Sequence, residues 1–219
     1  MSSQVVTQMY GLVGTAGADI FSLDGLLSHN VDGGAGVDTV FYPNLSTVHT
    51  EFAANGSILV QSPGVPFFQA DVLTNVERVK FIDKSIAFDL GVNQSAGETA
   101  LFMNAVLGKD SLTANKPLAG ILLGIFDQGV SQSAFSSYLF SSGVLANATG
   151  KANATSTDIA TFVLTNATGT VPDAATLAAA VNQLDTGDKA AWLTSVVTST
   201  AAQQHVDLVG LSHTGIAYV

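Results

Sequence analysis

The spacing of hydrophobic and polar residues changes near residue 93. Before that point, apolar and polar residues alternate over short runs, which is the period of a half-buried strand. After it, apolar residues recur every three or four positions, which is the period of an amphipathic helix. The pattern therefore predicts an α+β protein, with a small β domain over residues 1–92 and an all-α domain over residues 93–219.

Turn-forming residues divide the first part into strands. Ser46–Phe52 and Ser57–Gln61 flank an Ala-Ala-Asn-Gly segment, which predicts a β-hairpin. Val76–Phe81 and Ser85–Leu90 are predicted to form two further strands around a turn. The charged residues of this region are interpreted as a solvent-exposed face, made of Glu77, Arg78, Lys80 and Asp83.

Helix-starting and helix-stopping residues divide the second part into predicted helices. These span residues 98–107, 117–126, 131–142, 157–168, 173–186, 189–201 and 204–217, within an error of a few residues. Pro117 and Ser131 are residues that start helices, and Gly108 and Gly169 are residues that stop them. The polar segment Asn147–Thr155 is predicted to be a linker.

The helical part also contains an internal similarity. Phe126-Asp127-Gln128-Gly129 recurs 58 residues later as Leu184-Asp185-Thr186-Gly187, and each copy is followed by another predicted helix. The recurrence predicts a duplicated helical domain. Asp127 and Asp185 would then be caps at equivalent helix ends, and the glycines after them would have positive φ.

One short motif carries recognisable chemistry. Residues 33–40 read Gly-Gly-Ala-Gly-Val-Asp-Thr-Val, the nonapeptide pattern of calcium-binding parallel β-rolls. Glycines allow a tight turn whose carbonyls face a hard cation, and the aspartate supplies an anionic oxygen. A looser copy spans residues 14–21, and the spacing of the two copies excludes a long regular roll. We expect one or two calcium sites at most, with Gly14, Ala16, Asp19, Asp32, Gly33, Ala35 and Asp38 as the candidate ligands.

Composition narrows the classes of function. The 219 residues include 17 acidic and 7 basic ones, and the net charge of −10 argues against nucleic acid and anionic membranes as partners but suits calcium. The absence of cysteine excludes disulfides and thiolate metal sites. No run of about 18 apolar residues occurs, which predicts no membrane span. A hydrophobic fraction of 47% with only 11% charged residues favours self-association.

Catalytic signatures are missing from the sequence. It contains neither the Gly-x-Ser-x-Gly elbow of serine hydrolases nor the His-Glu-x-x-His motif of zinc proteases, so we expect no enzymatic activity. His205 and His213 lie eight residues apart, and an unbroken helix would place them on one face. We interpret them as surface or capping residues, with a metal or haem site as the open alternative. The same alternative applies to His49 and Tyr42 as a haem-binding pair.

Two fragments resemble a bacterial family. Asp32–Val40 and Leu73–Phe81 resemble the calcium-binding repeats-in-toxin proteins, which are exported by type I secretion. The helical part is similar to a domain of unknown function common in such proteins, with its Leu-Asp-x-Gly helix end at Leu184–Gly187, and His205–Val219 is similar to their carboxyl ends. The resemblance implies an extracellular or cell-surface location without an amino-terminal export signal, and residues 1–8 show no such signal.

We therefore expect a secreted structural protein that self-assembles into a surface layer, filament or extracellular matrix and is stabilised by calcium. Its contacts are predicted to use strand edges and apolar residues near the carboxyl terminus, namely Leu208, Leu211, Ile216 and Tyr218. The alternative is a secreted ligand-binding module, either a haemophore-like carrier or an adhesin that binds cell-surface polysaccharide.

Overall fold

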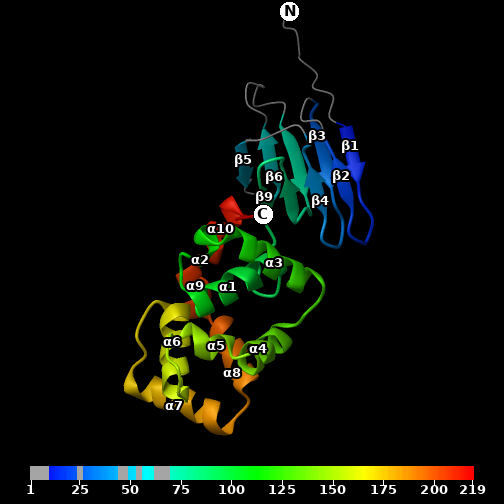
Figure 1. Cartoon of the computed structure of the whole chain (residues 1–219). Helices are drawn as coiled ribbons and strands as arrows, with labels where there is room; N and C mark the ends of the chain where they lie inside the picture. The colour runs from blue at the N-terminus through cyan, green and yellow to red at the C-terminus, as the bar shows by residue number, and fades with distance from the viewer. Residues whose placement is uncertain (1–9, 24–26, 44–48, 53–55, 62–69) are drawn as a thin grey trace, which may run out of the picture. The chain divides into compact units, whose positions relative to one another are not determined.

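The computed structural model describes residues 10–23, 27–43, 49–52, 56–61 and 70–219 (Figure 1). The chain divides into two compact units, one containing Met1–Asp89 and Gly210–Val219 and the other containing Leu90–Val209. The mixture of helices and strands confirms the α+β prediction. Among the described residues, no helix is long and apolar enough to cross a membrane.

The described strands of the first unit form two five-stranded sheets. The first sheet has the order β1 (Tyr10–Val13), β3 (His29–Asp32), β7 (Asp71–Thr74), β6 (Ile58–Gln61) and β5 (His49–Phe52). The second has the order β10 (Ile216–Tyr218), β9 (Ser85–Ala87), β8 (Arg78–Lys80), β4 (Thr39–Phe41) and β2 (Ile20–Ser22). Strands β1, β3 and β7 are parallel, as are β2, β4 and β8, and the other pairs are antiparallel.

The parallel pairs arise because the chain passes repeatedly from the first sheet to the second. Residues 14–19 connect β1 to β2, residues 33–38 connect β3 to β4, and residues 75–77 connect β7 to β8. Each passage makes one coil, and the next coil stacks on it through the strand hydrogen bonds. The antiparallel β5–β6 pair precedes the third coil and confirms the predicted hairpin. The rest of that prediction, residues 46–48 and 53–55, lies outside the described residues.

Apolar residues at matching register positions fill the space between the two sheets. Each parallel strand contributes one such residue, and the central strands contribute fully buried ones. The aligned residues are Leu12, Val31 and Leu73 on the first sheet and Phe21, Val40 and Val79 on the second. Tyr42 and Phe81 close this core with rings stacked at 5.5 Å between centroids.

Arg78 is buried, so the prediction of a solvent-exposed charged face is wrong for this residue. Its guanidinium donates hydrogen bonds to both carboxylate oxygens of Asp89, and the two side chains are 3% and 5% exposed. It also donates to the Glu77 carbonyl at 2.9 Å. Lys80 and Asp83 are exposed, as predicted. The alternation of the strand did not reveal the buried pair because Asp89 comes from a later segment.

The carboxyl terminus belongs to the β unit, in contrast to the prediction of a helix over residues 204–217. Helix α10 (Leu208–Thr214) ends at Gly215, which has φ +70, and β10 then pairs antiparallel with β9. Ile216 and Tyr218 have β-branched and aromatic side chains that favour a strand. Leu208 and Ile216 are buried within the chain, which excludes them as assembly contacts. The helical unit ends at Val209, ten residues before the predicted boundary.

The second unit is a bundle around one buried helix. Its helices are α1 (Ser95–Leu107), α2 (Ser111–Ala114), α3 (Lys116–Asp127), α4 (Gln132–Ser141), α5 (Val144–Ala148), α6 (Ser156–Thr168), α7 (Ala174–Thr186), α8 (Lys189–Val197) and α9 (Thr200–Val206). Residues 99–106 of α1 are all buried, and α1 packs against α3, α6 and α9. Because eight successive residues are buried, α1 is enclosed on every side, as is typical of a central helix.

Capping side chains explain where six of the described helices begin. The capping residues are Asn115 of α3, Ser131 of α4, Thr155 of α6, Asp173 of α7, Asp188 of α8 and Ser199 of α9, and each accepts a hydrogen bond from a backbone N–H of the first turn. The predicted starts at Pro117 and Ser131 are therefore confirmed. The single helix predicted over residues 189–201 is divided, because Ser199 starts a new helix after α8.

The two similar helix ends match in position but not in detail. Helix α7 begins 58 residues after α3, and Asp127 and Asp185 both lie in a last helical turn. Gly129 has φ +81, whereas Gly187 has φ −108, so the prediction of positive φ at both glycines is wrong for Gly187. Asp185 also accepts a hydrogen bond from the Ser156 hydroxyl, and so it joins two helices.

The Arg78–Asp89 pair should be essential to the β unit. Replacing Arg78 with methionine leaves the Asp89 carboxylate buried without its cation, and removal of one partner of such a pair costs about 3–5 kcal/mol. We expect Arg78→Met to accelerate amide hydrogen exchange in β8 and β9 by a corresponding factor. Lys80→Met, which changes an exposed lysine of the same strand, is the control and should have little effect. Equal exchange rates in the two variants would contradict this assignment.

Candidate metal centre at the stacked turns

The turns of successive coils approach one another closely because glycine occupies the contact positions. The Gly14 N–H donates to the Asp32 carbonyl at 2.8 Å, and the Gly33 N–H donates to the Thr74 carbonyl at 2.9 Å. A Cβ atom at Gly14 would lie 2.1 Å from the Gly33 carbonyl oxygen, and one at Gly33 would lie 2.0 Å from the Asn75 carbonyl oxygen. No residue with a side chain fits at either position.

A ladder of carboxylates connects successive turns. Asp38 accepts a hydrogen bond from the Asp19 N–H at 2.8 Å, and Glu77 accepts one from the Asp38 N–H at 2.8 Å. Each carboxylate thus reaches the backbone of the preceding coil. Asp19 begins the ladder, and its carboxylate accepts from the N–H and the hydroxyl of Thr15 in its own turn, at 2.6 Å and 2.9 Å.

Asp38 has an unused oxygen. The residue is 0% exposed, and its Oδ2 has no hydrogen-bond partner among the described residues. Burial raises the pKa of the Asp38 carboxyl, the Asp19 N–H opposes this shift, and the nearby charges of Asp19 and Asp32 raise the pKa further. Burial likewise raises the pKa of Glu77. Ionised carboxylates in this ladder therefore cost free energy unless a cation lies beside them.

An equivalent pair of oxygens, one carbonyl and one carboxylate, lies beside each contact glycine. The position of a Cβ at Gly33 is 2.0 Å from the Asn75 carbonyl oxygen and 2.7 Å from Asp38 Oδ2. At Gly14 it is 2.1 Å from the Gly33 carbonyl oxygen and 2.9 Å from Asp19 Oδ2. Each glycine thus marks a place where a peptide carbonyl of the next coil and a carboxylate of its own turn come together.

The predicted ligand residues divide into two groups. Gly14, Asp19, Gly33 and Asp38 are brought together at the stacked turns. Asp32 is at the entrance of the second turn, where its Oδ1 accepts from the Gly34 N–H at 3.2 Å and from Asn75 Nδ2 at 2.8 Å, so its role in the structure is to hold the turn. Ala16 and Ala35 are exposed at the turn tips, and the Ala35 N–H donates to the Thr15 carbonyl at 3.4 Å.

Asn75 and Glu77 belong to the same stack, although neither was predicted as part of it. Glu77 is half-buried, so its interpretation as a solvent-exposed charge is wrong. The third turn has three residues instead of six, and Asn75 adopts φ +50 to complete it. Asparagine tolerates this left-handed conformation better than most residues. The available signal was an acidic residue directly before a β-prone strand, because Glu77 precedes Arg78 as Asp38 precedes Thr39. Because the third turn contains no glycine, its sequence does not show that it is equivalent to the first two turns.

The arrangement fits a hard cation that accepts peptide oxygens. Within the part of the chain that the structure describes, no three His, Cys, Asp or Glu side chains converge on one metal position. The described turns therefore lack the set of side-chain ligands that zinc and similar metals require. Calcium is bound by carbonyl as well as carboxylate oxygens. The buried free oxygen of Asp38 and the adjacent carbonyls supply both kinds.

His29 and Tyr42 have other surroundings, and the side chain of His49, the other predicted haem ligand, lies outside the described part of the structure. His29 Nδ1 lies 2.9 Å from Asp71 Oδ1, and the Tyr42 hydroxyl donates to Asp71 Oδ2 at 2.8 Å. Tyr42 is fully buried, and burial together with Asp71 raises its pKa, which does not suit an exposed haem ligand. The unbroken helix that would place His205 and His213 on one face does not form, because Asp207 adopts φ +59 between α9 and α10.

Comparison with known proteins assigns no family to this chain. No family model matches it, and no curated protein matches its sequence. The candidate site therefore rests on the geometry of the turns.

Gly14 and Gly17 provide a matched test of the stacking. Gly14→Ala places a methyl group against the Gly33 carbonyl, and overpacking against a backbone atom costs about 1–3 kcal/mol or more. Gly17→Ala meets only the Thr15 hydroxyl at 3.9 Å and should be neutral or slightly stabilising. We expect faster hydrogen exchange in β1 and β3 for Gly14→Ala only. Equal behaviour of the two variants would show that the turns can separate at no cost.

Proposed function

We propose that this protein is a secreted, non-enzymatic structural protein whose β unit is a short, degenerate calcium β-roll of the repeats-in-toxin kind. The observation that carries the proposal is the buried, unpartnered Oδ2 of Asp38 beside the Asn75 carbonyl oxygen. Asp38, Asp19 and the carbonyls of the adjacent turns would hold the ion. Calcium would supply the positive charge that the carboxylate ladder lacks.

The electrostatics of the ladder support this role for calcium. A raised carboxyl pKa means that the folded state favours the protonated form, so the contribution to stability is greatest in acid and is lost as pH rises through the folded-state pKa. At neutral pH the ionised Asp38 and Glu77 carboxylates therefore destabilise the folded state in the absence of a cation. A divalent cation beside Asp38 would reverse this effect.

Self-assembly is the second part of the proposal. Strands β1 and β2 form one edge of their sheets within the described residues. Val13 of β1 and Ile20 of β2 are each 79% exposed. Edge strands with exposed apolar residues favour pairing between chains. We propose this edge as the contact between subunits of a surface layer, filament or extracellular matrix, in place of the buried Leu208 and Ile216.

The helical unit would act as a duplicated scaffold. Two observations support the duplication: helices α3 and α7 begin 58 residues apart, and Ser136 of α4 and Thr194 of α8, also 58 residues apart, join their hydroxyls at 2.9 Å. Contact between equivalent residues is what an internal two-fold relation produces. Export by type I secretion and an extracellular or cell-surface location remain part of this proposal through the sequence resemblance alone.

Calcium should stabilise the β unit measurably. A ligand that binds only the folded state adds about 2.7 kcal/mol at one hundred times its Kd. We expect CaCl2 to raise the melting temperature and slow hydrogen exchange in β3, β4 and β7, and Asp38→Asn to remove most of this effect. MgCl2 should do less, because magnesium requires stricter octahedral geometry.

Asp83→Asn is the control for Asp38→Asn, because Asp83 is an exposed carboxylate of the same unit outside the turns. This variant should keep the full response to calcium. An unchanged melting temperature of the native chain in calcium and in chelator would rule out the calcium part of the proposal, whatever the variants do.

Assembly should depend on the β1–β2 edge. We expect multi-angle light scattering to find oligomers in millimolar calcium, and Val13→Lys with Ile20→Lys to yield monomers, since charged edge residues prevent strand pairing. Val171→Lys changes an equally exposed valine of the helical unit and is the matched control. Monomers of the native chain at high concentration would exclude the structural role and favour the ligand-binding alternative.

A further inference from the structure

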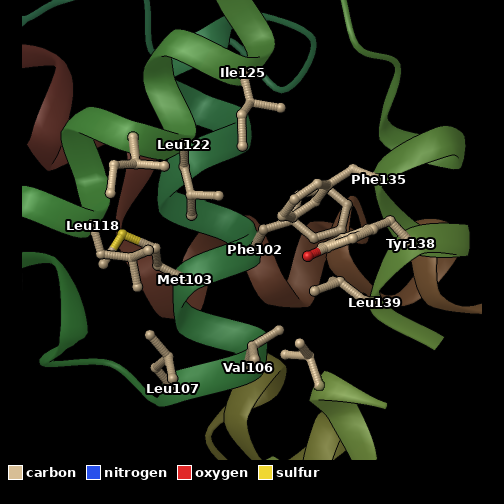
Figure 2. A pocket seen from close by; sticks show the side chains of 12 residues that line it. Phe102, Met103, Val106, Leu107, Leu118, Leu122, Ile125, Phe135, Tyr138 and Leu139 are labelled. Carbon is tan, nitrogen blue, oxygen red and sulfur yellow. The ribbon is translucent and has the colours of Figure 1, made fainter. Parts of the chain in front are cut away.

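The helical unit contains an apolar pocket of about 270 Å³ between α1, α3 and α4 (Figure 2). One wall is fixed by aromatic packing: the rings of Phe102 and Phe135 meet edge to face, with centroids 5.1 Å apart and planes at 86°. Both residues are buried. Ile121 also lines the pocket and is 61% exposed. The pocket therefore has buried aromatic residues in its lining and is open to solvent at Ile121.

The lining of the pocket is almost entirely hydrocarbon. None of the side chains around it is charged, and the one polar atom among them is the Tyr138 hydroxyl. Figure 2 shows the Tyr138 ring with this oxygen turned into the pocket beside Phe102 and Leu139. A buried charge or an unpaired polar group would be costly here. This lining favours a ligand whose buried part is apolar and has no more than one hydrogen-bonding group.

The size of the pocket selects a single chain or ring system. An apolar cavity of about 150 Å³ is known to hold benzene, so a pocket nearly twice as large accommodates on the order of eight to twelve carbon atoms. This volume is too small for a protein helix with its side chains. It is large enough for the alkyl chain of one amphiphile.

The second half of the unit shows that the fold does not require these apolar residues. Positions 58 residues later on α7 are exposed Thr176, Ala179 and Gln183, where α3 has residues that line the pocket. The corresponding residues of α3 are Leu118, Ile121 and Ile125. A helix in the same position of the sequence repeat thus tolerates polar and small residues on this face. The apolar face of α3 is better explained by a ligand than by folding.

Two basic residues lie close in the sequence to residues that line the pocket. Leu107 and Leu118 both line it, Lys109 follows the first by two positions, and Lys116 precedes the second by two positions. Both lysines are exposed, and they are two of only seven basic residues in the chain. Asp110 is the acidic residue beside them. In a protein with a net charge of −10, two exposed lysines this close in the sequence to lining residues favour a ligand with an anionic head group.

We propose that this pocket binds a free medium-chain fatty acid, with the alkyl chain between α1, α3 and α4 and the carboxylate near Lys109 and Lys116. A free fatty acid fits better than a membrane lipid, because the net negative charge of the chain opposes contact with an anionic surface. This binding activity goes beyond the proposed structural function and does not depend on calcium.

Isothermal titration calorimetry with sodium decanoate tests the proposal. We expect saturable binding of one decanoate per chain, with octanoate about tenfold weaker because two buried methylene groups are lost. Decanol keeps the chain but lacks the charge and should bind several-fold more weakly than decanoate. Lys109→Gln combined with Lys116→Gln should remove this difference. Light scattering with vesicles of anionic lipid should detect no binding.

Ile121→Glu places a charge in the wall and should weaken decanoate at least tenfold, and circular dichroism checks that the exposed substitution leaves the helices intact. Val171→Glu, at an exposed valine outside the pocket, should leave the affinity unchanged.

Absence of saturable binding, or equal losses of decanoate affinity in these two variants, overturns the proposal. Binding to vesicles in preference to decanoate overturns it in favour of a lipid surface. Conversion of an oligomer to a monomer by Ile121→Glu, without decanoate binding, overturns it in favour of a contact between copies.

Discussion

The β unit depends on the close approach of one turn's backbone to the next. The strands of neighbouring coils can pair along their full length only if the turns at their ends stack at the same spacing. Gly14 and Gly33 satisfy this requirement, because any Cβ would overlap a carbonyl oxygen of the following coil. Glycine is required at these two positions because a side chain has no room, and not because of the backbone angles, since neither glycine has a positive φ. The glycines of the motif are therefore a packing constraint before they are part of any metal site.

The same close approach brings several carboxylates near one another, which costs electrostatic free energy. Stacked turns bring Asp19, Asp38 and Glu77 into one column, where each carboxylate has a backbone N–H as its main partner. A few residues away, Arg78 and Asp89 form a buried pair in which the charges are balanced internally. The column has no comparable cation among its described contacts. This difference explains why an external cation would act at the turns and not at the ion pair.

The sequence predicted the parts of the fold that depend on local signals. The helix starts at Pro117 and Ser131 follow from capping chemistry, and the turn at residues 33–38 follows from its glycines. It did not predict β10, because Ile216 and Tyr218 become a strand only when β9 presents an edge for them to pair with. The burial of Arg78 likewise depends on a partner eleven residues away. The third turn was missed because Asn75 replaces a glycine at the stacking position.

Because the turns contain few carboxylates, the proposed calcium site would be occupied only where the calcium concentration is high. Calcium affinity rises with the charge and number of ligands, and sites with few carboxylates work in the millimolar range found outside cells. At the turns the buried Asp38 oxygen is joined mainly by neutral carbonyls, so a strong site is not expected. The ladder would then stay uncompensated where calcium is scarce and become stable where it is abundant. Under the proposed function, export itself would supply the ion that completes the β unit, and folding of this unit would be linked to arrival outside the cell.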